Sequence, residues 1–266
     1  MINADKPQRK FSLSLGATYF ALFTLFMYLP IALLVIFSFN DSPTLTFPLN
    51  GFTLKWYKAL WENQELVTAV SNSLLVGVLS SLVATALGTM AALGVIRFDF
   101  RGKTLFLSVA AMPLVIPAVV MGVAMLIVFT HVGIPLTLWT VGIGHVIINA
   151  PYAMLIVAAR LAGFEEHVEE AAMDLGADYW ATLWRVTLPM SAPALAAAFL
   201  SSFTTSLDEF AVTFFLVGSD TTLPVYLYSQ LRFPSRLPLV VTLAAIMMVI
   251  SVFIVIVVEK LRKMAN

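Results

Sequence analysis

Six long apolar stretches, separated by short polar segments, dominate the pattern of the chain. They cover approximately residues 13–39, 67–96, 104–130, 137–159, 191–217 and 238–258. Each is long enough to supply the roughly 20 helical residues that cross the apolar core of a bilayer. The first is too long for the apolar part of a signal peptide, which has about 7–15 residues. The pattern predicts an all-α membrane protein with six transmembrane helices, built as a single domain over residues 1–266.

The composition supports a membrane protein and excludes several other classes. Hydrophobic residues make up 60% of the chain, charged residues only 11%, and the mean hydropathy is +0.94. This is too little charge to cover a water-facing surface. The 15 basic residues balance the 15 acidic ones, so the basic excess that nucleic-acid binding needs is missing. The sequence has no cysteine, which excludes disulfides and thiolate metal sites.

The distribution of basic residues favours an orientation with both termini in the cytoplasm. Six spans place the two termini on one side, and Lys and Arg are enriched in cytoplasmic loops. In this orientation the N-terminal cluster lies inside, and few basic residues lie outside: Lys55, Lys58, Arg232 and Arg236. Residues 41–65 and 218–238 then form the two sizeable external loops.

The connector between the fourth and fifth spans, residues 160–190, is unusually acidic. Apolar residues recur along its first part at helical spacing: Val168, Ala172, Leu175 and Tyr179. Gly176 is placed to end this helix in a left-handed conformation, and Asp178 to cap a second short helix. One interpretation is a helical hairpin that lies on the bilayer. Because interfacial helices usually present Lys and Arg to anionic lipid, the glutamates here favour docking on a protein partner.

The connector contains a recognisable motif. Glu170-Ala171-Ala172 is followed by Gly176 and then by Val186-Thr187-Leu188-Pro189. This spacing resembles the EAA loop of binding-protein-dependent ABC importer permeases, with Val186 in place of Ile as the one departure. Other stretches, among them the segment from Ser206 to Phe210, are similar to the second permease subunit of spermidine/putrescine importers. The resemblance implies a type I ABC importer permease fold with a cytoplasmic coupling helix between spans four and five.

The resemblance also implies partners and roles. In such permeases the coupling helix sits in a cleft of an ATPase subunit, whose closure on ATP switches the pathway. The residues implied in coupling are Glu170, Ala171, Ala172, Asp174, Gly176, Leu188 and Pro189. The implied partners are a second permease subunit in a heterodimer, two ATPase subunits that hold ATP and Mg²⁺, and an extracytoplasmic substrate-binding protein. The implied location is the cytoplasmic (inner) membrane of a bacterium.

The chain itself is expected neither to be an enzyme nor to bind a cofactor. Residues 101–104 end like a phosphate-binding loop, but Arg97 stands where that motif requires its first glycine. The sequence shows no cluster of His, Asp and Glu at metal-ligand spacing and no nucleophile beside a base. ATP hydrolysis is therefore expected on a separate subunit.

Asp208 and Glu209 are the candidate residues of the substrate pathway, with Thr205 and Ser206 just before them. Ionisable residues within a span usually face a cavity or a partner and mark function. A carboxylate pathway suits a polyamine, because a polycation that leaves water needs compensating negative charge. One alternative is that the acidic pair lies at the outer end of the helix, where water solvates it and it has no role in transport. Another is that the hydroxyls of Thr205 and Ser206 bond carbonyls of their own helix.

Other polar or kinking residues also allow two interpretations. Pro113 and Pro117 either unwind the third span beside a cavity or are ordinary residues of a membrane helix. His145 and Asn149 share one helix face, where they bond to neighbouring helices or touch substrate. The sequence favours the structural interpretation in both cases.

The function that fits best is a permease subunit that forms half the pathway of an ATP-driven importer, with a polyamine as substrate. Related permeases carry other small organic solutes, including amino-acid-like compounds and organophosphonates. An alternative of another class is an ion-coupled secondary transporter, in which Asp208 and Glu209 bind the ion. A third is a membrane scaffold whose connector binds a partner without transport.

Overall fold

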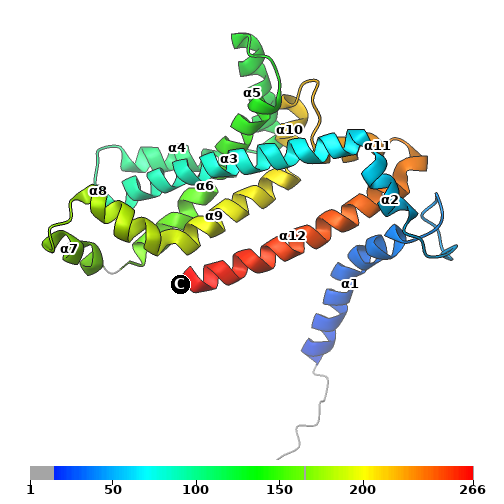
Figure 1. The fold of residues 1–266 in the computed structure, drawn as a ribbon, viewed down its shortest axis with the longest axis horizontal. Coiled ribbons are helices and arrows are strands. Elements are labelled where there is room, and N and C mark those ends of the chain that lie inside the picture. Colours follow the sequence, from blue (N-terminus) through cyan, green and yellow to red (C-terminus); the bar gives the residue numbers. More distant parts are fainter. Residues whose placement is uncertain (1–14, 165, 266) are drawn as a thin grey trace, which may run out of the picture.

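The computed structural model describes residues 15–164 and 166–265, and their regular structure is helical (Figure 1). The basic N-terminal residues used in the orientation argument, Lys6, Arg9 and Lys10, lie outside the described part. The elements are α1 (Leu15–Ser38), α2 (Lys55–Glu62), α3 (Gln64–Arg97), α4 (Lys103–Val115), α5 (Ala118–Val132), α6 (Leu138–Ala162), α7 (Glu166–Asp174), α8 (Tyr179–Thr182), a π-helical turn η1 (Leu183–Thr187), α9 (Leu188–Asp208), α10 (Ala211–Leu216), α11 (Leu223–Gln230), a 3-10 turn η2 (Pro234–Arg236) and α12 (Leu237–Ala265).

Five helical stretches of the described chain are long and apolar enough to cross a membrane. They are Leu15–Ser38, Gln64–Arg97, Leu138–Ala162, Tyr179–Asp208 and Pro234–Val257. The pair formed by α4 and α5 passes the same test of length and composition, and counting it as one span gives up to six. The expected all-α architecture with several membrane-length helices is confirmed, whereas a total of six requires the bent pair to cross as one span.

The expected third span, residues 104–130, is not one continuous helix. α4 and α5 meet at an angle of 107°. Ile116 adopts an extended backbone between them, and Pro117 precedes α5. A proline lacks the N–H that would continue the helix and disfavours helical geometry at the residue before it, so the break falls at this step. The prediction that these prolines are ordinary helix residues is wrong for Pro117, whereas Pro113 lies inside α4.

The centre of the fold is formed by α3, α6 and α9, which pack against one another along their lengths. Small residues let their backbones approach closely. A Cβ added to Gly88 of α3 would lie 2.7 Å from both the Cβ of Ala153 and the backbone nitrogen of Met154 in α6. Close packing of small residues is how helices associate in lipid, where burial of apolar surface gives little driving force.

α1 lies at the edge of the molecule and points away from the central helices (Figure 1). Ser38, at its end, is its one buried residue. The Ser38 hydroxyl lies 2.8 Å from the Tyr57 hydroxyl of α2, and the Ser38 carbonyl accepts a hydrogen bond from Thr242 Oγ1 of α12 at 3.3 Å. One end of α1 is therefore held by polar contacts and by packing on α12, while most of its remaining apolar surface is exposed within this single chain.

Candidate functional site: the acidic connector and the break in the fifth span

The connector forms a helix, a sharp turn and a second helix at one end of the molecule (Figure 1). Gly176 has a φ of +91°, the left-handed conformation expected from the sequence. Behind it, the Ala177 N–H donates to the carbonyl of Ala172 at 3.1 Å, which closes the turn. The Asp178 carboxylate accepts a hydrogen bond from the Ala181 N–H at 2.7 Å and caps α8. Both predicted end signals of the connector are therefore confirmed.

The motif residues lie on the surface of this connector. Glu170 keeps 62% of its side chain exposed, and its carboxylate lies 3.2 Å from the ring of His167 one turn earlier. Ala171 and Asp174 are exposed, and Ala172 is half-buried. Leu188 and Pro189 begin α9 beyond the π-helical turn. The segment around Glu170 is therefore presented outward rather than used in packing.

The apolar stripe expected on the first connector helix is packed only in part, since Val168 and Ala172 are half-buried. α7 ends at Asp174, so Leu175 lies beyond the helix and is 90% exposed. The large side chains of Trp180 and Trp184 are also about two-thirds exposed, at 65% and 66%. Exposed apolar residues and exposed glutamates on the same connector indicate a surface suited to a protein partner.

A second glutamate of the connector, Glu169, is bound to the body of the protein. Its Oε1 lies 2.9 Å from the guanidinium of Arg97, the last residue of α3. The same oxygen accepts a hydrogen bond from the Thr187 hydroxyl at 2.8 Å. The Arg97 and Glu169 side chains are only 17% and 18% exposed. Sequence reasoning missed this contact because the two residues are 72 positions apart and each resembles an ordinary loop charge.

The expected fifth span, residues 191–217, is interrupted at the acidic pair. α9 ends at Asp208, Glu209 has an extended backbone with φ −73° and ψ 107°, and α10 begins at Ala211. The Glu209 carboxylate accepts a hydrogen bond from the Val212 N–H at 2.9 Å, so it satisfies one of the N–H groups that the first turn of α10 leaves without a helical partner. The assumption that both acidic residues lie on one continuous helix is therefore wrong.

The break gives Asp208 and Glu209 different surroundings. Glu209 is half-buried and engaged in the local turn. Asp208 is exposed, and its carboxylate forms no hydrogen bond or ion pair with any residue that the structure describes. Of the two carboxylates, Asp208 is thus the one available to a ligand or a partner.

A buried chain of hydrogen bonds joins this break to the neighbouring helices. His145 of α6 is 2% exposed, with its Nδ1 2.6 Å from Ser206 Oγ and its Nε2 2.8 Å from Thr213 Oγ1. Ser206 also lies 3.3 Å from Ser80 of α3. Thr213 donates its proton to the Glu209 carbonyl at 2.8 Å.

The network fixes the roles of the two ring nitrogens. A hydroxyl has one proton to donate, and Thr213 donates its proton to the Glu209 carbonyl. Thr213 therefore accepts from His145 Nε2–H, and Ser206 donates to Nδ1. Such interhelical bonding confirms the structural interpretation of His145. Asn149 is also buried, but its side-chain oxygen has no partner among the described residues.

The other candidate hydroxyl in this region bonds its own helix. Thr205 Oγ1 donates to the Ser201 carbonyl at 3.0 Å, although the side chain is exposed. Thr204 does the same with the Leu200 carbonyl at 2.9 Å. The hydroxyls of these two residues therefore bond their own helix, whereas Ser206 is part of the buried network.

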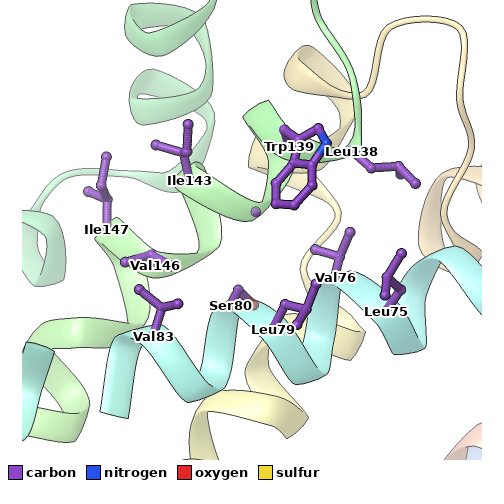
Figure 2. Close-up of a pocket in the computed structure, with 11 residues that line it drawn as sticks. Leu75, Val76, Leu79, Ser80, Val83, Leu138, Trp139, Ile143, Val146 and Ile147 are labelled. Atoms are coloured by element: carbon purple, nitrogen blue, oxygen red, sulfur yellow. The ribbon is translucent and has the colours of Figure 1, made fainter. Parts of the chain in front are cut away.

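A groove on the face between α3 and α6 is apolar. Figure 2 shows Leu75, Leu79 and Val83 of α3 facing Ile143 and Val146 of α6, with Trp139 between Ile143 and Leu138. The cavity measures about 370 Å³, and Ser80 is its one side chain with a polar group other than the Trp139 indole. Such a lining suits lipid or another apolar helix, and a polycation would find no compensating charge there. Among the described residues, no group of His, Asp and Glu is arranged to hold a metal ion.

Known proteins similar to this chain agree with one another on its class. Residues 84–264 match the family described as binding-protein-dependent transport system inner membrane component. The spermidine/putrescine transport system permease protein PotC of Escherichia coli K12 is 35% identical over 234 residues, which cover 87% of each chain. The putrescine transport system permease protein PotI of the same strain is 34% identical over 218 residues, 78% of this chain and 76% of that one.

The fold is similar to a chain in the crystal structure of a bacterial ABC transporter involved in the import of the acidic polysaccharide alginate. The TM-score is 0.73, with 17% identity, and the match covers 98% of this chain and 99% of the other. At this identity the likeness concerns the fold alone. Since the family match spans most of the sequence and the two permease relatives cover most of it as well, the chain belongs to the binding-protein-dependent inner-membrane permeases of ABC importers.

Proposed function

We propose that this chain forms half of the translocation pathway of an ATP-driven importer of a polyamine, such as putrescine or spermidine. A second permease subunit forms the other half as a heterodimer. Two ATPase subunits bind ATP and Mg²⁺, and an extracytoplasmic binding protein delivers the substrate. This chain contributes no catalytic residue; it converts motion of the ATPases into opening and closing of the pathway.

The observation that carries the proposal is the outward presentation of the connector. Glu170 is exposed next to Ala171, and the left-handed Gly176 shapes the turn that follows. Small residues allow close approach of a partner, and an exposed glutamate can form a charge-assisted hydrogen bond with a basic partner residue. This surface is the docking site for an ATPase subunit, with Leu188 and Pro189 leading from it into the fifth span.

The end of the molecule that carries the connector also supports an orientation in the membrane. Arg97 and the connector lie together through the ion pair with Glu169. Placing this end in the cytoplasm agrees with the enrichment of basic residues in cytoplasmic loops. α9 has 21 residues, so Asp208 lies about 30 Å along its helix from Leu188, near the opposite face of the membrane. Asp208 is then placed where a substrate enters from outside.

Two observations support a polyamine as substrate. PotC and PotI, named as polyamine permeases, are about one-third identical over most of this chain. Asp208 offers an unpaired carboxylate at the break of the fifth span, where a cation gains a charge-assisted contact. The fold does not by itself select a substrate, since a transporter of an acidic polysaccharide shares it.

Coupling is tested in proteoliposomes that contain the complete transporter. Glu170→Lys and Gly176→Val should insert normally but lose uptake of putrescine while the ATPase subunits still hydrolyse ATP. Asp99→Lys is the matched control, because Asp99 is fully exposed at the same end and lies outside the connector. Wild-type uptake by both connector variants would contradict the docking role.

The substrate is tested separately on the cognate binding protein. Calorimetric titration with putrescine, spermidine, an amino acid and an organophosphonate should show tight binding of a polyamine alone. Tight binding of one of the non-polyamine solutes would show that the importer carries another substrate. The role of this chain as an importer permease would be unaffected.

A further inference from the structure

Glu169 makes two contacts that its exposed neighbour Glu170 does not make. Its carboxylate binds Arg97 at the end of α3 and Thr187 in the π-helical turn, 2.9 and 2.8 Å away. One carboxylate therefore joins three elements: α7, α3 and η1. Thr187 is itself buried, and η1 leads without interruption into α9.

α7 has little apolar packing of its own. Its described side chains are all exposed or half-buried. Between α7 and the end of α3 lies a cavity of about 190 Å³, lined by Arg97, Phe98, Glu169, Met173 and Thr187 among others. α7 packs mainly on α8 and η1. The ion pair between Arg97 and Glu169 lies at this cavity, where side-chain packing is incomplete. It is therefore a principal link between α7 and α3, called the tie below.

The environment makes this tie stronger than a surface ion pair. Fully exposed pairs contribute little, because water screens them. Here both partners are less than one-fifth exposed, and a hydroxyl satisfies the carboxylate further. Removing one partner leaves a largely buried charge without compensation, which is far more disruptive than loss of the contact alone.

We propose that the Arg97–Glu169–Thr187 contact is a positioning device that transmits movement of the connector to α3, in parallel with the covalent path through η1 into α9. The proposal rests on the connector's docking role described above. Without this tie, a moving connector would pull on α9 alone. With it, α3 and α9, two of the three central helices, move together with α7.

Because the wild-type chain has no cysteine, this idea can be tested by distance measurement. Spin labels are attached to His167→Cys on α7 and Val78→Cys on α3, positions whose side chains are 90% and 38% exposed. In the assembled transporter the label distance should be narrowly distributed, both without nucleotide and after trapping with ADP and vanadate. In Arg97→Gln and Glu169→Gln the distribution should broaden, and it should shift on trapping.

The same variants should lower the putrescine imported per ATP hydrolysed by about fivefold, the size of effect typical of residues that carry coupling between sites. The charge swap Arg97→Glu with Glu169→Arg should restore most of the ratio and the narrow distance distribution. Asp99→Asn, which removes the exposed ion pair with Lys103 at the same end of α3, is the control and should behave as wild type.

The outcomes separate this inference from the proposed function. Single variants with wild-type distances and wild-type coupling would overturn the tie, as would a swap that remains as impaired as the single variants. Thr187→Val, which keeps the ion pair but removes one hydrogen bond, should give a smaller effect of the same kind. A wild-type transporter that takes up putrescine without ATP would instead overturn the proposed function.

Discussion

His145 Nε2 and Thr213 Oγ1 lie 2.8 Å apart and join α6 to the segment that follows the break in the fifth span. On its other side the same ring meets Ser206, near the end of the helix that precedes the break. One histidine therefore holds both sides of the interruption at Asp208 and Glu209. A break held in this way keeps Asp208 in one place relative to α6.

Replacing His145 by leucine should destabilise the protein by about 1–3 kcal/mol, because two interhelical hydrogen bonds are lost and two buried hydroxyls each lose a partner. The loss is measured as a lower midpoint of thermal unfolding in detergent. His131→Leu, at an exposed position in α5, is the control. Equal midpoints for the two variants would argue against a structural role for the network.

The two neighbouring carboxylates should respond differently to substitution. Asp208→Asn should reduce putrescine uptake about tenfold with little change in stability, since a charge-assisted contact of roughly 1.5 kcal/mol is lost. Glu209→Ala should lower stability by about 0.5–2 kcal/mol, because the Val212 N–H in the first turn of α10 loses its acceptor. Uptake and thermal unfolding of both variants are compared. Unchanged uptake in Asp208→Asn would remove this residue from the pathway.

Gly176 is required for its backbone conformation rather than for lack of space. A Cβ added there meets nothing within 4 Å, but the φ is +91°. Asn tolerates the left-handed region and Val does not. Gly176→Asn should therefore keep most of the uptake, whereas Gly176→Val should lose it. If both variants transported equally, the shape of the turn would not matter for coupling.

Gly88, in contrast, is required for space. Its Cβ would collide with the backbone of α6, which cannot yield as a flexible side chain can. Gly88→Ala should cost about 1–3 kcal/mol or prevent folding. Gly142→Ala is the matched control, since a Cβ there meets nothing within 4 Å. The yield of folded protein and its thermal midpoint distinguish the two.

The long helices could be predicted from sequence because each needs only a run of apolar residues. The interruptions were harder to foresee. Pro117 breaks a helix, yet Pro113, four residues earlier, lies within one. Prolines are common in membrane helices, so their presence alone does not decide the outcome. At Glu209 neither Gly nor Pro marks the break. The Glu209 side chain instead accepts a hydrogen bond from the backbone N–H of Val212, three residues later.

The candidate site was predictable where local chemistry fixes it. The turn at Gly176 and the cap at Asp178 follow from residue type and spacing, and the structure has both. The tie between Glu169 and Arg97 depends on where α3 ends relative to α7. Likewise, the two partners of His145 come from different elements, Ser206 from α9 and Thr213 from α10, and Ser206 also contacts Ser80 of α3. Contacts of this kind follow from the packing of distant segments, which one sequence does not specify.

The source of energy for transport tests the account most directly. Putrescine uptake is measured in proteoliposomes that hold this chain with its partner permease, with and without the ATPase subunits, under internal ATP and Mg²⁺ or under an imposed proton or sodium gradient. We predict accumulation only with the ATPase subunits, ATP and external binding protein together. Accumulation driven by an ion gradient in vesicles that lack the ATPase subunits would contradict the account.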